Sequence, residues 1–128
     1  MVYQAVFSGA GTKERWSLKQ AEKRVSQALT AKPGLSWTAC VFGQPVGFAF
    51  VGLKEGHAGL YGDLTEIGVH PYFQRQGIGR ELLKSVKARL EKKKIQSLYG
   101  LVYRGTAEKF FGENGFKRSK RSVVMALR

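Results

Sequence analysis

Residues 64–83 read LTEIGVHPYFQRQGIGRELL, and this stretch decides the fold. It predicts a strand that ends before Pro71, then a glycine-containing loop, and then a long amphipathic helix. A strand–loop–helix junction gathers free backbone N–H groups and the positive end of the helix dipole at one point. The stretch therefore predicts a binding site for a phosphate group.

The helix is predicted to run from Gly77 to about Lys94. Its apolar residues recur at helical spacing on one stripe, and its lysines and arginines fall largely outside that stripe. The cluster Lys92-Lys93-Lys94 closes the last turn, where positive charge interacts favourably with the helix dipole. The stripe is expected to pack on a sheet, and it consists of Ile78, Leu82, Leu83, Val86 and Leu90.

The junction also carries a spaced-glycine motif, Gln74-x-x-Gly77-x-Gly79, which follows Val69-x-Pro71. A dinucleotide fingerprint would need a third glycine at position 82, and a P-loop would need Gly-Lys-Ser/Thr, so neither is met. A second motif, Ala107-x-x-Phe110-Phe111-x-x-x-Gly115-Phe116, lies downstream. In this order and spacing the two motifs resemble the acetyl-CoA signature and the late helix of the GCN5-related N-acetyltransferase (GNAT) family.

The resemblance implies an N-acetyltransferase that transfers an acetyl group from acetyl-CoA to an amine of a small molecule or protein. It also implies that the strand before the signature bulges and exposes backbone groups to the pantetheine arm. Gly68 is consistent with this, because a glycine inside a strand often marks a bulge or a close backbone approach. The cofactor-binding residues predicted in this way are Ile67, Gly68, Val69, Gln74, Arg75, Gln76, Gly77, Ile78, Gly79, Arg80, Arg104, Phe110 and Phe111.

Acetyl transfer requires a neutral amine, so a carboxylate that accepts a proton directly or through a water is the expected catalytic group. Asp63 and Glu66 are the candidates, because both lie on the strand that approaches the thioester. In a regular strand they point to opposite faces, so at most one enters the pocket, and a bulge would change this parity. His70 is expected to be a turn residue and His57 an exposed loop residue. No metal site is predicted.

The chain departs from the family pattern at the late helix. Phe111 stands where the family usually carries a tyrosine that protonates the leaving thiolate, and a phenyl ring has no such proton. Tyr99, Tyr103 or water are the alternatives. Arg104 takes about the place of an asparagine that often contacts the cofactor. These departures leave a catalytically weak or inactive family member as an alternative.

The whole pattern predicts one α/β domain over all 128 residues. The expected architecture is a mixed, mostly antiparallel sheet flanked by helices, with a splayed parallel strand pair. A helix is expected from a Ser17–Gln20 capping box to a stop at Lys32-Pro33-Gly34, and a short one from a cap at Thr106 to Asn114-Gly115. The strand over 46–53 is apolar on both faces and is expected inside the sheet. The other expected strands cover residues 2–7, 36–42, 60–70 and 95–103, with the last ones between 116 and 127.

Lysine and arginine outnumber the acidic residues 22 to 9, which gives a net charge of +13. This charge suits a polyanionic cofactor, and it also suits an anionic partner such as RNA or the ribosome. The second hypothesis for function is therefore an acyl-CoA-binding module whose basic surface binds such a partner. A third joins the two: acetylation of an amine presented on RNA or on a ribosomal protein. Because many family members pair through a sheet edge, a homodimer is a further expectation.

No apolar run is long enough to span a bilayer and the first residues lack a secretory signal pattern, so a soluble, cytoplasmic protein without a membrane partner is expected. The one cysteine, Cys40, excludes a disulfide within the chain and is expected to be buried in an apolar strand.

Overall fold

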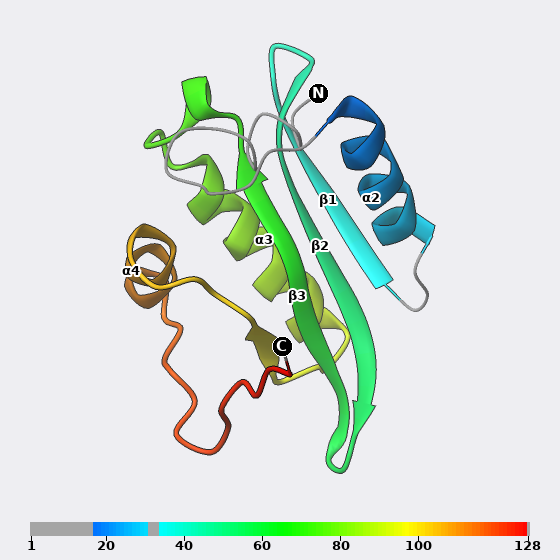
Figure 1. Ribbon diagram of the computed structural model, residues 1–128, viewed down its shortest axis with the longest axis vertical. Helices are drawn as coiled ribbons and strands as arrows, with labels where there is room; N and C mark the ends of the chain where they lie inside the picture. The colour runs from blue at the N-terminus through cyan, green and yellow to red at the C-terminus, as the bar shows by residue number, and fades with distance from the viewer. Residues whose placement is uncertain (1–16, 31–33, 128) are drawn as a thin grey trace.

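The computed structural model describes residues 17–30 and 34–127. Within them a four-stranded sheet has the order β1-β2-β3-β4 (Figure 1). The antiparallel meander consists of β1 (Gly34–Val41), β2 (Gln44–Gly56) and β3 (Gly59–Val69), and β4 (Leu98–Gly100) pairs with β3 in parallel. The predicted fold class, a mixed and mostly antiparallel sheet with one parallel pair, is confirmed.

In the described part of the chain, three α-helices and one short 3-10 helix accompany the sheet (Figure 1). They are α2 (Leu18–Thr30), η1 (Pro71–Phe73), α3 (Ile78–Lys92) and α4 (Thr106–Glu113). The predicted capping box begins α2: the Ser17 hydroxyl accepts from the Gln20 N–H at 3.1 Å, and the Gln20 amide oxygen accepts from the Ser17 N–H at 3.0 Å.

The core lies between α3 and one face of the sheet. Leu83 and Val86 of α3 are 1% and 0% exposed, and they pack with Ala49, Val51 and Leu64 from the two central strands. The predicted apolar stripe of α3 is thus the face that covers the sheet. Since β2 lies between β1 and β3, its burial on both faces is also confirmed.

The opposite face of the sheet carries the residues of β2 that alternate with this core. Phe48 and Phe50 stack there with ring centroids 5.3 Å apart, and Arg24 reaches the same face from α2. The helices α2 and α3 therefore lie on opposite faces. This sandwich leaves the end of β3 and the beginning of α3 at one end of the molecule (Figure 1).

Several predicted elements differ from the structure. Residues 116–127 contain no strand: the charged run from Lys117 to Arg121 is exposed, and the apolar residues after it are exposed as well. The strand predicted over 95–103 is reduced to Leu98–Gly100, because Lys94 turns the chain at a φ of 60° and Ile95 fills the core below α3.

Two single-residue predictions are also wrong. Gly105, not Thr106, is the N-cap of α4, and it offers no side chain for the cap. Cys40 is exposed rather than buried, because the residues of β1 alternate between half-buried and exposed and Cys40 falls in the exposed row. His57 is exposed in the turn between β2 and β3, as expected. The strand predicted over 2–7 and the stop at Lys32-Pro33 lie outside the described residues.

Candidate active site

The amino end of α3 presents backbone N–H groups without a side-chain cap. Gly77 is the N-cap, with a left-handed φ of 85°, and it makes no side-chain cap hydrogen bond. The first intrahelical bond runs from the Glu81 N–H to the Gly77 carbonyl at 3.0 Å, which leaves the N–H groups of Ile78, Gly79 and Arg80 pointing out of the helix. An anion is the natural partner of such a helix start.

The loop before α3 keeps this helix start close to the end of β3. The Gln74 side-chain amide donates to the Val69 carbonyl at 2.9 Å, and the His70 Nδ1 accepts from the Tyr72 N–H at 3.2 Å. His70 is thus a turn residue, as predicted. Arg75 adopts a φ of 63° and is exposed, as are Gln76 and Arg80. Two exposed arginines, Arg75 in the loop and Arg80 in the first turn of α3, therefore flank the uncapped helix start.

The strand β3 has an open edge next to this helix start. It pairs with β4 only at Gly62, Asp63 and Leu64, so among the described residues no strand lies beside positions 65–69 on that side. The His70 N–H donates to the Val46 carbonyl at 2.7 Å, and antiparallel pairs alternate in bonding, so the backbone groups of Ile67 and Val69 face away from β2. This is the divergence of parallel strands that the family resemblance implies.

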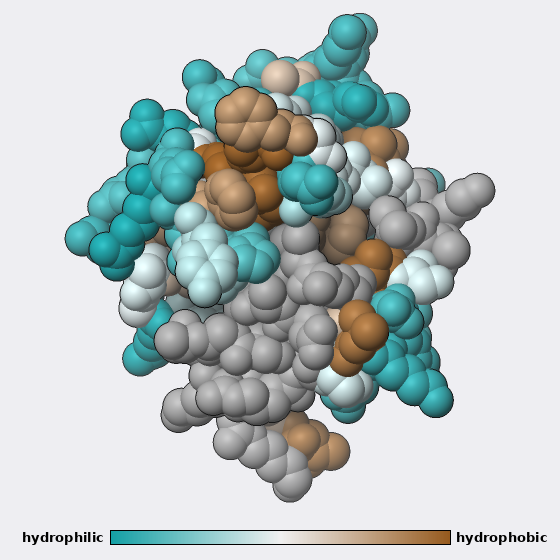
Figure 2. Space-filling model, turned by 90° about the horizontal axis from the view of Figure 1, so that it is seen from above, coloured by the Kyte–Doolittle hydropathy of each residue, from teal (hydrophilic) through white to brown (hydrophobic). Residues whose placement is uncertain are grey.

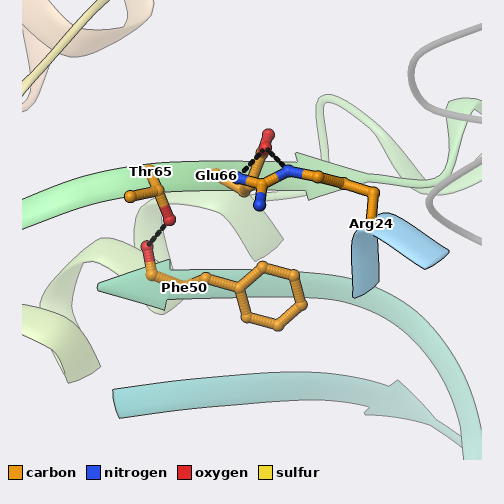
Figure 3. A network of polar contacts seen from close by, with 4 residues as sticks. All are labelled: Arg24, Phe50, Thr65 and Glu66. Carbon is orange, nitrogen blue, oxygen red and sulfur yellow. Dashed lines mark hydrogen bonds and ion pairs between the residues drawn. The ribbon is translucent and has the colours of Figure 1, made fainter. Parts of the chain in front are cut away.

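A bulge in β3 sets the direction of the two candidate carboxylates. Phe50 pairs with Glu66 but Val51 pairs with Leu64, so Thr65 is the extra residue of β3. The Thr65 hydroxyl donates to the Phe50 carbonyl at 3.1 Å and pins this irregularity (Figure 3). Gly68, the residue predicted to mark the bulge, pairs regularly with Phe48.

The bulge places Asp63 and Glu66 on the same face of the sheet. Asp63 lies opposite Gly52 and Glu66 lies opposite Phe50, and these two residues of β2 share the face that α2 covers. Of the two cases expected from the sequence, the structure therefore shows the one in which a bulge changes the parity, and the regular strand with the carboxylates on opposite faces is excluded. Both are on the side opposite α3.

Each of these carboxylates is paired with a cation. Glu66 Oε1 lies 2.7 Å from Nη2 and 2.9 Å from Nε of Arg24, which reaches it from α2 (Figure 3). Asp63 Oδ2 lies 2.9 Å from Lys54 Nζ. The hydrogen bond to Asp63, and then its negative charge, raise the pKa of the Lys54 ammonium. In the free protein, the negative charge of each carboxylate on this face of β3 is thus balanced by a neighbouring cation.

The helix α4 packs against the first turn of α3. A Cβ added at Gly79 would lie 3.0 Å from the tip of the Phe110 ring, so this glycine allows the two helices to approach. Phe111 is 9% exposed and belongs to the core, where its ring meets Phe116 edge-on. The two neighbouring aromatic residues of the late motif therefore have different positions: Phe110 borders the helix start and Phe111 faces the interior.

Three other predicted residues lie further along this edge. Tyr99, in β4, is 58% exposed and stands edge-on to Tyr61, and Tyr103 is 77% exposed. Arg104 is exposed just before α4. The structure brings the start of α3 and the end of β3 together, whereas Tyr99 lies in β4, and Tyr103 and Arg104 lie on the segment between β4 and α4.

Figure 2 looks onto the end of the molecule where α3 begins, and hydrophobic side chains are exposed there among hydrophilic ones. Exposed apolar residues on elements at this end are Leu18, Phe42 and Tyr72. The described residues include no group of three His, Cys, Asp or Glu side chains placed to bind a metal ion. Within residues 17–30 and 34–127, no helix has the length and apolar character needed to cross a membrane.

Sequence reasoning missed Arg24 and Thr65. Arg24 meets Glu66 across 42 residues of chain, and nothing local in the sequence indicates that contact. Thr65 is β-branched and suits a regular strand as well as a bulge, so its role depends on the cross-strand register.

A profile of the family described as "Acetyltransferase (GNAT) domain" matches residues 3–126. No curated protein matches the sequence.

Solved structures share the fold at low sequence identity. An aminoglycoside acetyltransferase from an uncultured soil metagenomic sample, in complex with sisomicin, has a TM-score of 0.76 at 16% identity, over 96% of this chain and 83% of that one. A ribosomal-protein-alanine N-acetyltransferase from Brucella melitensis has a TM-score of 0.71 at 19% identity, over 83% and 82%. An aminoglycoside N-acetyltransferase in complex with CoA has a TM-score of 0.69 at 19% identity, over 87% and 88%. With nearly its whole length matched by the family profile, the chain belongs to the GNAT acetyltransferase domain family.

Proposed function

We propose that the protein is an N-acetyltransferase that uses acetyl-CoA as its donor and an amine as its acceptor. The observation that carries the proposal is the uncapped start of α3 beside the open edge of β3. A diphosphate and an amide-rich pantetheine arm need these two features side by side. Membership of the GNAT family and the CoA complex of a structural neighbour support the same donor.

The residues at the helix start fit a diphosphate. The N–H groups of Ile78, Gly79 and Arg80 lack a cap, and the side chains of Arg75 and Arg80 add charge-assisted donors. Along β3, the outward backbone groups of Ile67 and Val69 would pair with the pantetheine amides, except for the Val69 carbonyl that Gln74 already occupies. Acetyl-CoA, when bound, supplies the activated acetyl group.

The reaction joins the amine nitrogen to the acetyl carbonyl carbon and breaks the bond from that carbon to sulfur. One proton must leave the amine, and one must reach the thiolate. Glu66 and Asp63 lie on β3 and are the candidate proton acceptors, directly or through a water. Phe111 cannot protonate the thiolate, so Tyr99, Tyr103 or water supplies that proton. Holding both substrates in one geometry contributes the rest of the acceleration.

Thiol release from acetyl-CoA, followed with a panel of amines, tests the proposal. We expect acceptor-dependent release of CoA by the wild type and a loss of roughly a hundredfold in kcat for Glu66→Gln or Asp63→Asn, whichever is the base. Glu81→Gln, an exposed carboxylate on α3, is the matched control and should keep the wild-type rate. If no amine increases thiol release by a protein that binds acetyl-CoA, the transferase assignment is wrong.

A second candidate function is an acyl-CoA-binding module that attaches to RNA or the ribosome. The observation that favours it is the run Lys117-Arg118-Ser119-Lys120-Arg121, which is exposed throughout. RNA binding by this surface should fall steeply with salt, and Lys117→Glu with Lys120→Glu should weaken it without affecting acetyl-CoA binding. RNA affinity that is insensitive to salt and to these substitutions would reject this candidate.

A further inference from the structure

The ion pair between Arg24 and Glu66 lies on the face of the sheet that α2 covers, opposite α3, and Glu66 is one of the two candidate bases of the proposed reaction. The Glu66 side chain is 14% exposed and the Arg24 side chain is 31% exposed, so the pair is mostly withdrawn from solvent but can still be reached. The desolvation cost of an ion pair withdrawn from water can exceed the mutual attraction of its charges. Such a pair is therefore weak support for a purely stabilising role.

The two charges of this pair together complement a zwitterion. Glu66 can bind an ammonium group, and the planar guanidinium of Arg24 can bind a carboxylate through two parallel hydrogen bonds. The two side chains come from different elements, α2 and β3, and they meet directly above the strand (Figure 3). A molecule with an amine and a carboxylate a few atoms apart could replace each partner of the pair with its own opposite charge.

The charge of the site argues against a polycationic acceptor. Both candidate carboxylates of β3 are already compensated, Glu66 by Arg24 and Asp63 by Lys54. The whole chain carries a net charge of +13, which repels an acceptor with several ammonium groups. The same charge attracts an acceptor that carries an anionic group.

We propose that the acceptor is an α-amino acid or a closely similar zwitterion, with its ammonium group received by Glu66 and its carboxylate by Arg24. This inference rests on the proposed function, since it names the acceptor of the same acetyl transfer. Arg24 then acts as a specificity-determining residue. In the free protein its guanidinium occupies the place that the ammonium group of the acceptor takes.

The test compares matched acceptors that differ only in the anionic group. Initial rates are measured with standard L-α-amino acids, with their primary amides, and with sisomicin as a polycation. The amide has the less basic amine and hence more of the reactive neutral form, so a preference for the free acid cannot come from amine basicity. We expect kcat/KM to favour the acid over its amide by roughly ten- to a hundredfold, with sisomicin a poor acceptor.

Variants of Arg24 identify the residue responsible for this preference. Arg24→Gln should raise the KM for the amino acid by roughly tenfold or more, leave the KM for acetyl-CoA unchanged, and bring the ratio of acid to amide close to one. Arg24→Lys keeps the charge without the planar fork and should restore part of the preference. Lys84→Gln removes the cation of an exposed ion pair on α3 and serves as the control. It should change neither the KM for the amino acid nor the ratio of acid to amide.

The outcomes separate this inference from the proposed function. Equal rates with acids and amides, or a faster rate with sisomicin, would overturn the zwitterion assignment while leaving an acetyltransferase. An unchanged acid preference in Arg24→Gln would remove Arg24 from substrate recognition. Acetyl-CoA binding without acetylation of any panel member would also count against the inference, whereas failure to bind acetyl-CoA would count against the function itself.

Discussion

The Thr65 hydroxyl donates a hydrogen bond to the Phe50 carbonyl across the strands at 3.1 Å, at the point where β3 has one residue more than β2. This contact fixes the bulge, and the bulge turns Asp63 and Glu66 toward the same face of the sheet. The divergence of β3 from β4 begins at the same residue, because their pairing ends at Leu64. One local irregularity thus sets the direction of the candidate bases, and it lies where the open edge of β3 begins.

Replacing Thr65 with valine tests how much this hydrogen bond contributes to the fold. Valine keeps the branched shape and removes the hydroxyl, so the free energy of unfolding should fall by about 1 kcal/mol. Denaturant unfolding measures this change, and Thr38→Val, in the exposed row of β1, is the matched control. A loss no larger at Thr65 than at Thr38 would mean that the bulge is held by the strand register alone.

Gly62 is expected to be essential for the packing of β3 against β4 and α3. A Cβ at this position would lie 2.9 Å from Leu98, 3.2 Å from Val51 and 3.4 Å from Leu90. Gly62→Ala should therefore lower the free energy of unfolding by about 1–3 kcal/mol, as overpacking usually does.

Gly112 provides the control for this substitution. It lies in α4 with nothing within 4 Å of an added Cβ, so Gly112→Ala should stabilise the protein by up to about 1 kcal/mol. Thermal or denaturant unfolding of the two variants measures both changes in the free energy of unfolding, which we expect to have opposite signs. Stabilisation by both substitutions would show that the packing around Gly62 is looser than described.

Arg80→Glu should separate helix stability from ligand binding. A carboxylate in the first turn of α3 suits the helix dipole, so stability should not decrease. The new carboxylate would repel the phosphates, and the substitution also removes the Arg80 guanidinium. The Kd for CoA should therefore rise by about tenfold or more. Lys84→Glu makes the same charge change one turn later and should have a much smaller effect. Equal effects of the two variants on Kd would point to general charge rather than to the helix start.

The contact between Glu108 and Arg118 predicts an acid-dependent contribution to stability. The hydrogen bond from Arg118, together with the positive charges of Arg118 and Arg104, lowers the pKa of the Glu108 carboxyl. A lowered folded-state pKa gives stability that is present above the ordinary carboxyl pKa and is lost as pH falls through the lowered value.

The stability difference between wild type and Glu108→Gln should accordingly be constant near neutral pH and vanish under acidic conditions. Arg118→Gln should remove the same contribution, and the double variant should add nothing further. Denaturant unfolding over a pH series measures these differences in the free energy of unfolding. A difference that persists at acidic pH would contradict the assignment to this ion pair.

Local patterns in the sequence were enough to predict the helix start. The spacing of Gly77 and Gly79 and the apolar stripe of α3 depend only on neighbours in the chain, and the structure confirms the strand–loop–helix junction there. The central position of β2 was predicted in the same way, from the apolar residues on both of its faces, and the sheet order confirms it.

Features that depend on contacts between distant residues could not be predicted. The parity of Asp63 and Glu66 depends on a register shift between two strands, and the partner of Glu66 lies 42 residues away. The apolar residues after Arg121 have strand propensity, but propensity alone does not supply a pairing partner, and in the structure they remain exposed.

Calorimetric titration of acetyl-CoA into the wild type, Gly77→Glu and Gly43→Glu tests the central claim most directly. Both glycines have a left-handed φ, 85° and 76°, and open space around an added Cβ, so both variants carry the same backbone strain. Only Gly77→Glu places a carboxylate at the start of α3. We predict binding to the wild type and to Gly43→Glu, with at least about tenfold weaker binding to Gly77→Glu. No binding to the folded wild type, or equal affinity for all three proteins, would contradict a diphosphate site at this helix start.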